Sequence, residues 1–228
     1  MNKPVLLDLF CGAGGATRGY QQAGFYVVGV DWRPQPRYVG DAFIQADALE
    51  YARTHGELYD AIHASPPCQR HSALRRVHKD DPDYKARHID LIPETYALLQ
   101  SLNRPYVIEN VIGAPLDNAI VLCGAAFGLK VYRHRLFESN KLLLAIPHTP
   151  HRDHTPRAGG GISPKGFISI AGNGGGKIDG MKGVPPGWKW LDYARFAMGI
   201  DWMNRKELSQ AIPPAFTHFI GLQLKKWC

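Results

Sequence analysis

The sequence predicts an α/β fold built on a doubly wound, mostly parallel sheet. Short apolar runs rich in strand-forming residues alternate with stretches of helical spacing, which is typical of strand–helix–strand units. Several runs end in a polar side chain, and open parallel sheets bind their ligands at the carboxyl ends of the strands. A glycine cluster after the first run marks a strand-to-helix turn. We therefore expect the functional residues at one edge of the sheet.

The elements follow in order from the spacing of the apolar residues. We expect strands at residues 4–10, at 26–30, in a run ending near Asp47, at 59–64 and at 106–108, and helices at 16–23, 84–102, 191–198 and 215–224. Pro66 and Pro67 stop the fourth strand, and Pro105 closes the long helix. Pro, His and Gly dominate from about residue 140 to 187, which predicts an insertion or small lobe.

The composition is that of a globular chain with a basic balance. Of the 228 residues, 45% are hydrophobic and 21% are charged, values that exclude disordered, collagen-like and coiled-coil proteins. The formal net charge of +7 suits a polyanionic partner such as nucleic acid, although it also serves solubility. Basic residues and histidines concentrate in two stretches, Arg70, His71, Arg75, Arg76, His78 and Lys79, and His148, His151, Arg152, His154 and Arg157.

The four cysteines predict free thiols in a reducing compartment. Cys11, Cys68, Cys123 and Cys228 lie far apart and form no C-x-x-C pair, so neither a zinc site nor a disulfide framework is indicated. The first residues lead directly into a strand-like run that is neither a signal peptide nor a membrane span. We expect a cytoplasmic monomer with no metal and no membrane partner.

The first motif, Asp8-Leu9-Phe10-Cys11-Gly12-Ala13-Gly14-Gly15, predicts a turn where a ligand can approach the backbone closely. A nucleoside cofactor fits such a turn, but similar turns also serve packing alone. Asp31 follows at a spacing suited to hydrogen bonds with ribose hydroxyls, unless it is a surface carboxylate. Trp32 either stacks on adenine or caps the core edge. Asp47 either binds the adenine amino group or caps the following helix.

The second motif, Ser65-Pro66-Pro67-Cys68-Gln69, places a thiol on a rigid turn after a strand. Helix-terminal dipoles and the nearby Arg70 and His71 are expected to favour the thiolate, which is the nucleophilic form of cysteine. A buried inert cysteine is the usual alternative. A Pro-Pro-Cys turn between polar residues is a poor core position, so the motif favours a nucleophile at Cys68.

The third motif, Glu109-Asn110-Val111, places another carboxylate at the end of a strand. Burial in a site would raise the pKa of Glu109, so that it could hydrogen-bond to or protonate a ring nitrogen. A surface or capping carboxylate is the alternative, and the residues of this motif leave both open.

In this order the three motifs resemble those of the cytosine-5 DNA methyltransferase family: its cofactor motif, its Pro-Cys motif and its Glu-Asn-Val motif. Arg133-His134-Arg135 resembles the family's Q-x-R-x-R motif, with Val131 in place of the glutamine. Residues 191–202 look like the segment before the last motif. Ser209-Gln210-Ala211-Ile212-Pro213-Pro214 resembles that G-N-x-V-P motif, with Ser and Gln replacing Gly and Asn. The resemblance extends from residue 6 to about residue 222.

The resemblance implies a Rossmann-like enzyme that transfers a methyl group from S-adenosylmethionine to carbon 5 of a cytosine flipped out of double-stranded DNA. It assigns Cys68 to attack on carbon 6, Glu109 to ring nitrogen 3 and the exocyclic amine, and Arg135 to support of the base. Arg133 is a further catalytic candidate. The cofactor is expected against Asp8, Phe10, Gly12, Gly14, Asp31, Trp32, Asp47 and Pro66.

The resemblance also implies a domain organisation, with residues 1–137 as the catalytic domain and residues 191–228 completing it. Residues 138–190 would form a reduced target-recognition lobe, with phosphate contacts from His151, Arg152, His154, Arg157, Lys165 and Lys177. A solvated loop with no DNA contact is the alternative. A small lobe rich in glycine, including Gly172 and residues 174–176, predicts a recognition site of roughly two to four base pairs.

Three alternatives remain open at this point. The chain could be a catalytically silent DNA-binding relative, an RNA cytosine-5 methyltransferase, or an enzyme that makes another modification at carbon 5. The resemblance implies a bacterial or phage-infected cell as the setting, with restriction–modification among the roles.

Overall fold

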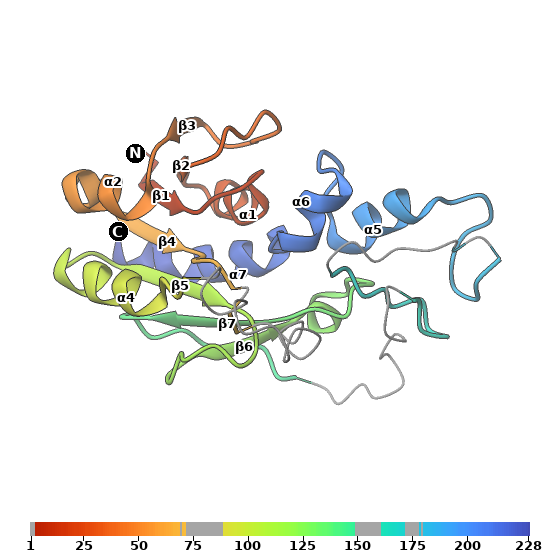
Figure 1. Ribbon diagram of the computed structural model, residues 1–228. Coiled ribbons are helices and arrows are strands. Elements are labelled where there is room, and N and C mark those ends of the chain that lie inside the picture. Colours follow the sequence, from red (N-terminus) through yellow and green to blue (C-terminus); the bar gives the residue numbers. More distant parts are fainter. Residues whose placement is uncertain (1–2, 69, 72–88, 149–160, 172–177, 179) are drawn as a thin grey trace.

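A single sheet organises the chain (Figure 1). The computed structural model describes residues 3–68, 70–71, 89–148, 161–171, 178 and 180–228. In this part of the chain the sheet has seven strands in the order β3-β2-β1-β4-β5-β7-β6. The strands are β1 (Val5–Leu9), β2 (Tyr26–Asp31), β3 (Ala42–Gln45), β4 (Ala61–Ala64), β5 (Tyr106–Asn110), β6 (Ile120–Cys123) and β7 (His134–Ser139).

The strand order confirms the predicted doubly wound fold. Strands β1 to β5 are parallel, and β7 is antiparallel to both of its neighbours, β5 and β6. From β1 the chain winds outward through β2 and β3, and it then returns to place β4 on the other side of β1. The order therefore reverses between β1 and β4, and a crevice opens at the carboxyl ends of strands at such a point.

Helices cover both faces of the sheet. Helices α1 (Gly15–Gln22) and α7 (Pro214–Leu224) pack on one face, and α2 (Ala48–His55) and α4 (Ile92–Ser101) pack on the other. Successive strand residues point to opposite faces. Leu6 and Val27 accordingly belong to the core under α1 and α7, whereas Leu7 and Val28 belong to the core under α2 and α4.

A third apolar cluster lies beyond the carboxyl ends of the parallel strands, where Figure 1 shows α5 (Trp190–Met198) and α6 (Arg205–Gln210). Ile168 and Ile170 pack into this cluster with α5. Helix α6, which the apolar spacing did not predict, begins with a capping box, because the Asn204 side chain accepts from the Glu207 N–H and the Glu207 carboxylate accepts from the Asn204 N–H.

Two predicted boundaries differ from the elements of the structure. In the described residues the helix expected from residue 84 begins only at Ile92, and residues 84–88 lie outside the described part. Pro93 stands in its first turn, where the missing N–H of proline costs nothing, and Asp90 accepts from the Ile92 N–H. The expected domain boundary at residue 138 falls inside β7. None of the described helices is both long and apolar enough to cross a membrane.

Candidate active site

A cavity of about 740 Å³ opens at the carboxyl ends of β1, β2, β4 and β5, beside the point where the strand order reverses. Most of the expected site residues line it, namely Asp8, Phe10, Gly12, Asp31, Trp32, Asp47, Pro66, Cys68, Glu109 and Arg135. The C-terminal part of the chain contributes Met203, Glu207, Gln210, Ala211 and Ile212. Of the expected site residues, Gly14 and Arg133 do not line the cavity.

The glycine turn after β1 has an unusual backbone conformation. Phe10, Gly12 and Gly14 adopt positive φ angles of 60°, 51° and 84°, which only glycine takes without strain. A left-handed phenylalanine costs roughly 1–3 kcal/mol, and such strain is concentrated at functional sites. A Cβ atom on Gly15 would lie 2.6 Å from the Ile212 carbonyl oxygen, so the turn packs directly against the C-terminal segment.

Asp8 is a buried carboxyl group at the base of the cavity. The Thr17 hydroxyl donates to its Oδ2 at 2.5 Å, whereas its Oδ1 has no hydrogen-bond partner among the described residues. Burial is the main cause that raises the pKa of Asp8 to about 7. A ligand that brings a cation or a hydrogen-bond donor to this oxygen would favour the ionised form.

Asp31 links the end of β2 to the glycine turn. Its Oδ2 accepts from the Gly12 N–H at 3.1 Å and its Oδ1 accepts from the Arg33 N–H at 3.0 Å. Each carboxylate oxygen can accept a further hydrogen bond. Asp31 therefore lines the cavity while its carboxylate is held by the backbone N–H groups of Gly12 and Arg33.

Trp32 and Asp47 resolve two of the alternatives that the sequence left open. The Trp32 side chain is 63% exposed at the cavity, with the Arg33 guanidinium 4.4 Å from the centroid of its ring, so the core-edge alternative is wrong. Asp47 is the N-cap of α2, because its Oδ1 accepts from the Leu49 N–H at 2.9 Å and the Glu50 N–H at 3.0 Å. The capping alternative is thus confirmed for Oδ1 of Asp47, and these bonds do not use Oδ2.

Cys68 lies on a turn that is tied to β5. The Asn110 side chain donates from Nδ2 to the Pro66 carbonyl at 2.9 Å in a buried contact. Asn110 stands in the third motif, and its sequence position alone indicated no role for it. This bond holds the Pro-Pro turn against the strand that carries Glu109.

Arg135, and not the expected Arg70 or His71, is the cation that most favours the Cys68 thiolate. Burial raises the pKa of the Cys68 thiol, and the cation that most opposes this effect is Arg135. His71 is paired instead with Asp90, whose Oδ2 lies 2.8 Å from its Nε2. Arg135 and, to a smaller extent, Arg133 are thus the cations that favour deprotonation of the thiol.

Glu109 and Arg135 form a buried ion pair beside Cys68. Nε of Arg135 lies 2.9 Å from Oε1 of Glu109, and the two side chains are 14% and 7% exposed. Burial raises the pKa of Glu109 although Arg135 and the Ser65 hydroxyl both act to lower it. The surface alternative for Glu109 is wrong, and the raised pKa matches the direction expected of a proton donor.

Arg133 supports the site from outside the cavity. Its guanidinium donates to the carbonyl oxygens of Ile170, Ser209 and Ala211, and burial lowers its pKa to about 9. These bonds join the residue before β7 to the cavity-lining segment around residue 211. The geometry gives Arg133 a positioning part, not the contact with the reacting base expected of a catalytic residue.

A buried chain of polar side chains extends from α1 to Glu109. The Tyr20 hydroxyl lies 2.9 Å from Nδ1 of His63, and Nε2 of His63 lies 2.8 Å from the Ser65 hydroxyl. Burial lowers the pKa of His63 to about 3, so its ring is neutral, with one donor and one acceptor nitrogen.

One direction of this chain agrees with the effect of Ser65 on Glu109. A Ser65 hydroxyl that donates to the Glu109 carboxylate acts to lower the pKa of Glu109, and its oxygen is then free to accept from Nε2–H of His63. In that tautomer Nδ1 of His63 accepts from the Tyr20 hydroxyl. This arrangement was not predicted, because its only signal in the sequence is a histidine inside an apolar strand.

Comparisons with known proteins give one similar sequence and several similar folds. No family model matches this chain. Over 122 residues it is 29% identical to the Type II methyltransferase M.AgeI of Thalassovita gelatinovora, a match that covers 47% of this chain and 28% of that protein. The chain thus matches less than a third of the length of that relative.

Two solved structures align with almost the whole chain. A prophage-encoded protein of Escherichia coli, described as a DNA modification methyltransferase, aligns with a TM-score of 0.61 at 14% identity and covers 98% of this chain and 99% of its own. The Dnmt2 methyltransferase of S. pombe aligns with a TM-score of 0.60 at 12% identity and covers 99% of each chain. At these identities the similarity concerns the fold, which is that of Rossmann-like methyltransferases.

Proposed function

We propose that this chain is an S-adenosylmethionine-dependent methyltransferase that modifies carbon 5 of cytosine in double-stranded DNA. One observation carries the proposal: a single cavity joins Cys68 on its Pro-Pro turn, the buried Glu109–Arg135 pair and the glycine turn beside Asp31. The partial similarity to a Type II methyltransferase supports methyl transfer as the reaction class.

The residues at the glycine turn fit the proposed cofactor. Oδ1 of Asp8 is a buried acceptor with no partner in the described residues, and a cationic ligand such as this one would supply what it lacks. The carboxylate of Asp31 can accept from ribose hydroxyls, and the exposed Trp32 ring offers a stacking surface for adenine. When bound, S-adenosylmethionine would supply an electrophilic methyl group on a sulfonium.

The other side of the cavity fits a cytosine base that has left the helix. Addition of the Cys68 sulfur to carbon 6, with loss of the thiol proton to solvent, breaks the carbon 5–carbon 6 double bond and makes carbon 5 nucleophilic. Glu109, with its raised pKa, donates a proton to ring nitrogen 3 and so takes up the developing negative charge. After methylation, carbon 5 loses its proton to solvent, ring nitrogen 3 returns its proton to Glu109, and the Cys68 sulfur leaves as a thiolate, which restores the double bond.

Arg135 and the buried polar chain hold these two groups in place. The Arg135 guanidinium balances both the Glu109 carboxylate and the Cys68 thiolate as they form. The Tyr20–His63–Ser65 chain fixes the orientation of the Glu109 carboxylate with groups that carry no charge of their own.

Asp31→Ala is expected to weaken S-adenosylmethionine binding by about tenfold, since a hydrogen bond to a charged group contributes roughly 1.5 kcal/mol. Calorimetry on the purified protein measures the dissociation constant. Asp41→Ala is the matched control, because Asp41 accepts from the Val27 N–H but does not line the cavity. Equal dissociation constants in the wild type and Asp31→Ala would exclude the ribose role.

Ser65→Ala is expected to lower turnover by roughly tenfold, because Glu109 loses the hydroxyl that orients it. It should also raise the pKa of Glu109 further, so the Glu109-dependent limb of the pH–rate profile moves to higher pH. Tyr20→Phe removes the hydrogen bond at the far end of the Tyr20–His63–Ser65 chain, and it should lower turnover less than Ser65→Ala does. An unchanged pH–rate profile in Ser65→Ala would show that the hydrogen-bonded Tyr20–His63–Ser65 chain serves stability alone.

We also propose that the segment from the end of β7 at Ser139 to residue 190 is the target-recognition lobe. Of the expected phosphate contacts, Lys165 lies in the described part of the chain, whereas His151, Arg152, His154, Arg157 and Lys177 lie outside it, as do Gly172 and residues 174–176.

The affinity of the protein for DNA is expected to fall steeply as the salt concentration rises, because it depends on phosphate contacts. Bisulfite sequencing of methylated plasmid DNA would give the preferred context, and a strict site of about six base pairs or more would exclude a reduced lobe.

Mass spectrometry of product nucleosides tests the proposed function. Matched DNA and RNA duplexes are incubated with the protein and labelled S-adenosylmethionine, then digested to nucleosides. We expect 5-methyldeoxycytidine from DNA. Label in 5-methylcytidine would indicate an RNA enzyme, another modified base would overturn the carbon 5 assignment, and no label on any sequence would favour a silent DNA-binding relative.

A further inference from the structure

Three metal-binding side chains meet at the outer edge of the sheet. Cys123 is the last residue of β6 and His134 is the first residue of β7, and the two are directly opposite in the antiparallel register. His148 comes from the segment that follows β7. One nitrogen from each histidine and the cysteine sulfur all lie within 4.8 Å of one another, and the two Nε2 atoms are 3.0 Å apart.

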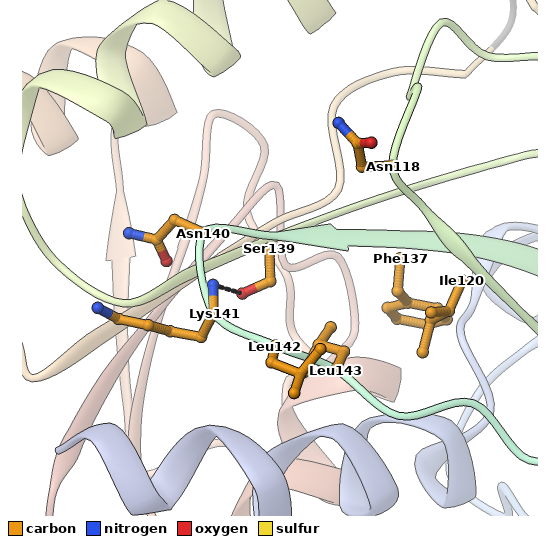
Figure 2. A pocket seen from close by; sticks show the side chains of 8 residues that line it. All are labelled: Asn118, Ile120, Phe137, Ser139, Asn140, Lys141, Leu142 and Leu143. Carbon is orange, nitrogen blue, oxygen red and sulfur yellow. Dashed lines mark hydrogen bonds between the residues drawn. The ribbon is translucent and has the colours of Figure 1, made fainter.

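The chain brings His148 to this place by folding back along the β6–β7 hairpin. Strand β7 ends at Ser139, whose hydroxyl accepts from the Lys141 N–H at 3.1 Å. Figure 2 shows Leu142 and Leu143 near Ile120 and Phe137, around a pocket of about 320 Å³.

Helix α7 holds the next residue of the return segment, which is the stretch from residue 140 to His148 that folds back after β7. The Leu144 N–H donates to Oε1 of Gln223 at 2.7 Å, and Nε2 of Gln223 donates to the Leu144 carbonyl at 3.2 Å. The contacts of residues 141 to 144 therefore fix the route of the return segment. His148, at the end of this segment, then lies beside the first residue of β7.

The positions of Cys123 and His134 are restricted by the fold. The Cys123 side chain is 2% exposed and lies at the paired end of β6. The ring of Tyr132 stands edge-on to His134 with the centroids 5.0 Å apart, which limits how that imidazole can turn.

We propose that Cys123, His134 and His148 bind one zinc ion. One sulfur and two imidazole nitrogens form a donor set that Zn²⁺ prefers, and the magnesium and calcium ions that favour oxygen ligands do not fit it. Each imidazole binds through the lone pair of its Nε2 and keeps its proton on Nδ1. Cys123 gives up its thiol proton to solvent, and water completes a tetrahedral site.

Zinc at this position joins the return segment to the β6–β7 hairpin. His134 is adjacent in sequence to Arg135, so the ion would fix both the start of β7 and the entry to the proposed recognition lobe. The sequence did not indicate this site, because its donors are separated by 10 and 13 residues and share no short motif. The zinc site does not depend on the proposed methyl transfer.

Metal binding to the full-length protein tests the proposal. The metal-free chain is titrated with zinc against a chromophoric chelator and, separately, with cobalt(II), which reports thiolate ligation by a charge-transfer absorption. We expect one zinc per chain and a thiolate–cobalt band. Cys123→Ser should lose the band and lower zinc affinity by at least about 100-fold, whereas Cys228→Ser, which alters an exposed thiol, should keep both.

His148→Gln separates ligation from folding. His148 is exposed, so its replacement should leave the fold intact, yet it should weaken zinc binding and remove the rise in melting temperature that zinc gives the wild type. Zinc bound equally by the wild type, Cys123→Ser and His148→Gln would place the metal elsewhere. No zinc held against the chelator would leave the two imidazoles as a simple hydrogen-bonded pair, and either result overturns the proposal.

Discussion

Cys68→Ala is expected to lower the rate of methyl transfer by at least about 10³-fold, because without the sulfur nothing adds to carbon 6. S-adenosylmethionine binding should remain close to that of the wild type, since Cys68 lies on the side of the cavity assigned to the base. Transfer of label to DNA gives the rate, and calorimetry gives the dissociation constant of the cofactor.

A second cysteine variant controls for the loss of a thiol. Cys228 is exposed near the C-terminus and does not line the cavity, so Cys228→Ala should retain wild-type turnover. Residual transfer in Cys68→Ala at more than a few per cent of the wild-type rate would contradict the role of Cys68. Lost cofactor binding in the same variant would indicate a disturbed fold.

Glu109→Gln is expected to lower turnover by about 10²-fold or more, which is the usual contribution of a positioned general acid. Because the pKa of Glu109 is raised, the wild type keeps its proton to a higher pH than an ordinary glutamate would. The protonated fraction falls as the pH rises through that pKa. Glutamine has no such proton, so this limb of the pH–rate profile should be absent in the variant.

Glu138→Gln is the matched control for this substitution. Glu138 is also a buried carboxylate, but it accepts from the Tyr96 hydroxyl at 3.0 Å and does not line the cavity. Its replacement should lower thermal stability and leave the pH–rate profile unchanged. If both variants showed the same profile as the wild type, Glu109 would not be the proton donor.

The parallel part of the fold was predictable because each element carries a local signal. The glycine turn, the prolines before Cys68 and the apolar spacing of α1, α5 and α7 all depend on residues close in sequence. Strands β6 and β7 were missed. In β7 the residues His134, Arg135 and Glu138 occupy strand positions with polar side chains, so tertiary contacts decide the structure there and propensity does not.

The site was predictable as a set of residues but not as a network. The motifs named Cys68, Glu109 and Arg135, and the structure places them around one cavity. The sequence assigned the stabilisation of the thiolate to Arg70 and His71, because these follow Cys68 directly, whereas Arg135 comes from a different strand. The parts played by His63 and Asn110 likewise depend on partners that only the folded chain brings together.

Trapping on DNA that contains 5-fluorodeoxycytidine tests the central claim most directly. Fluorine at carbon 5 cannot leave as a proton does, so the adduct formed by the nucleophile should persist after methyl transfer. We expect a stable complex of one chain with one duplex, dependent on S-adenosylmethionine, whose digestion yields the modified base on the peptide containing Cys68. An adduct of equal yield with Cys68→Ala, or one mapped to another residue, would contradict the assignment of Cys68 as the nucleophile.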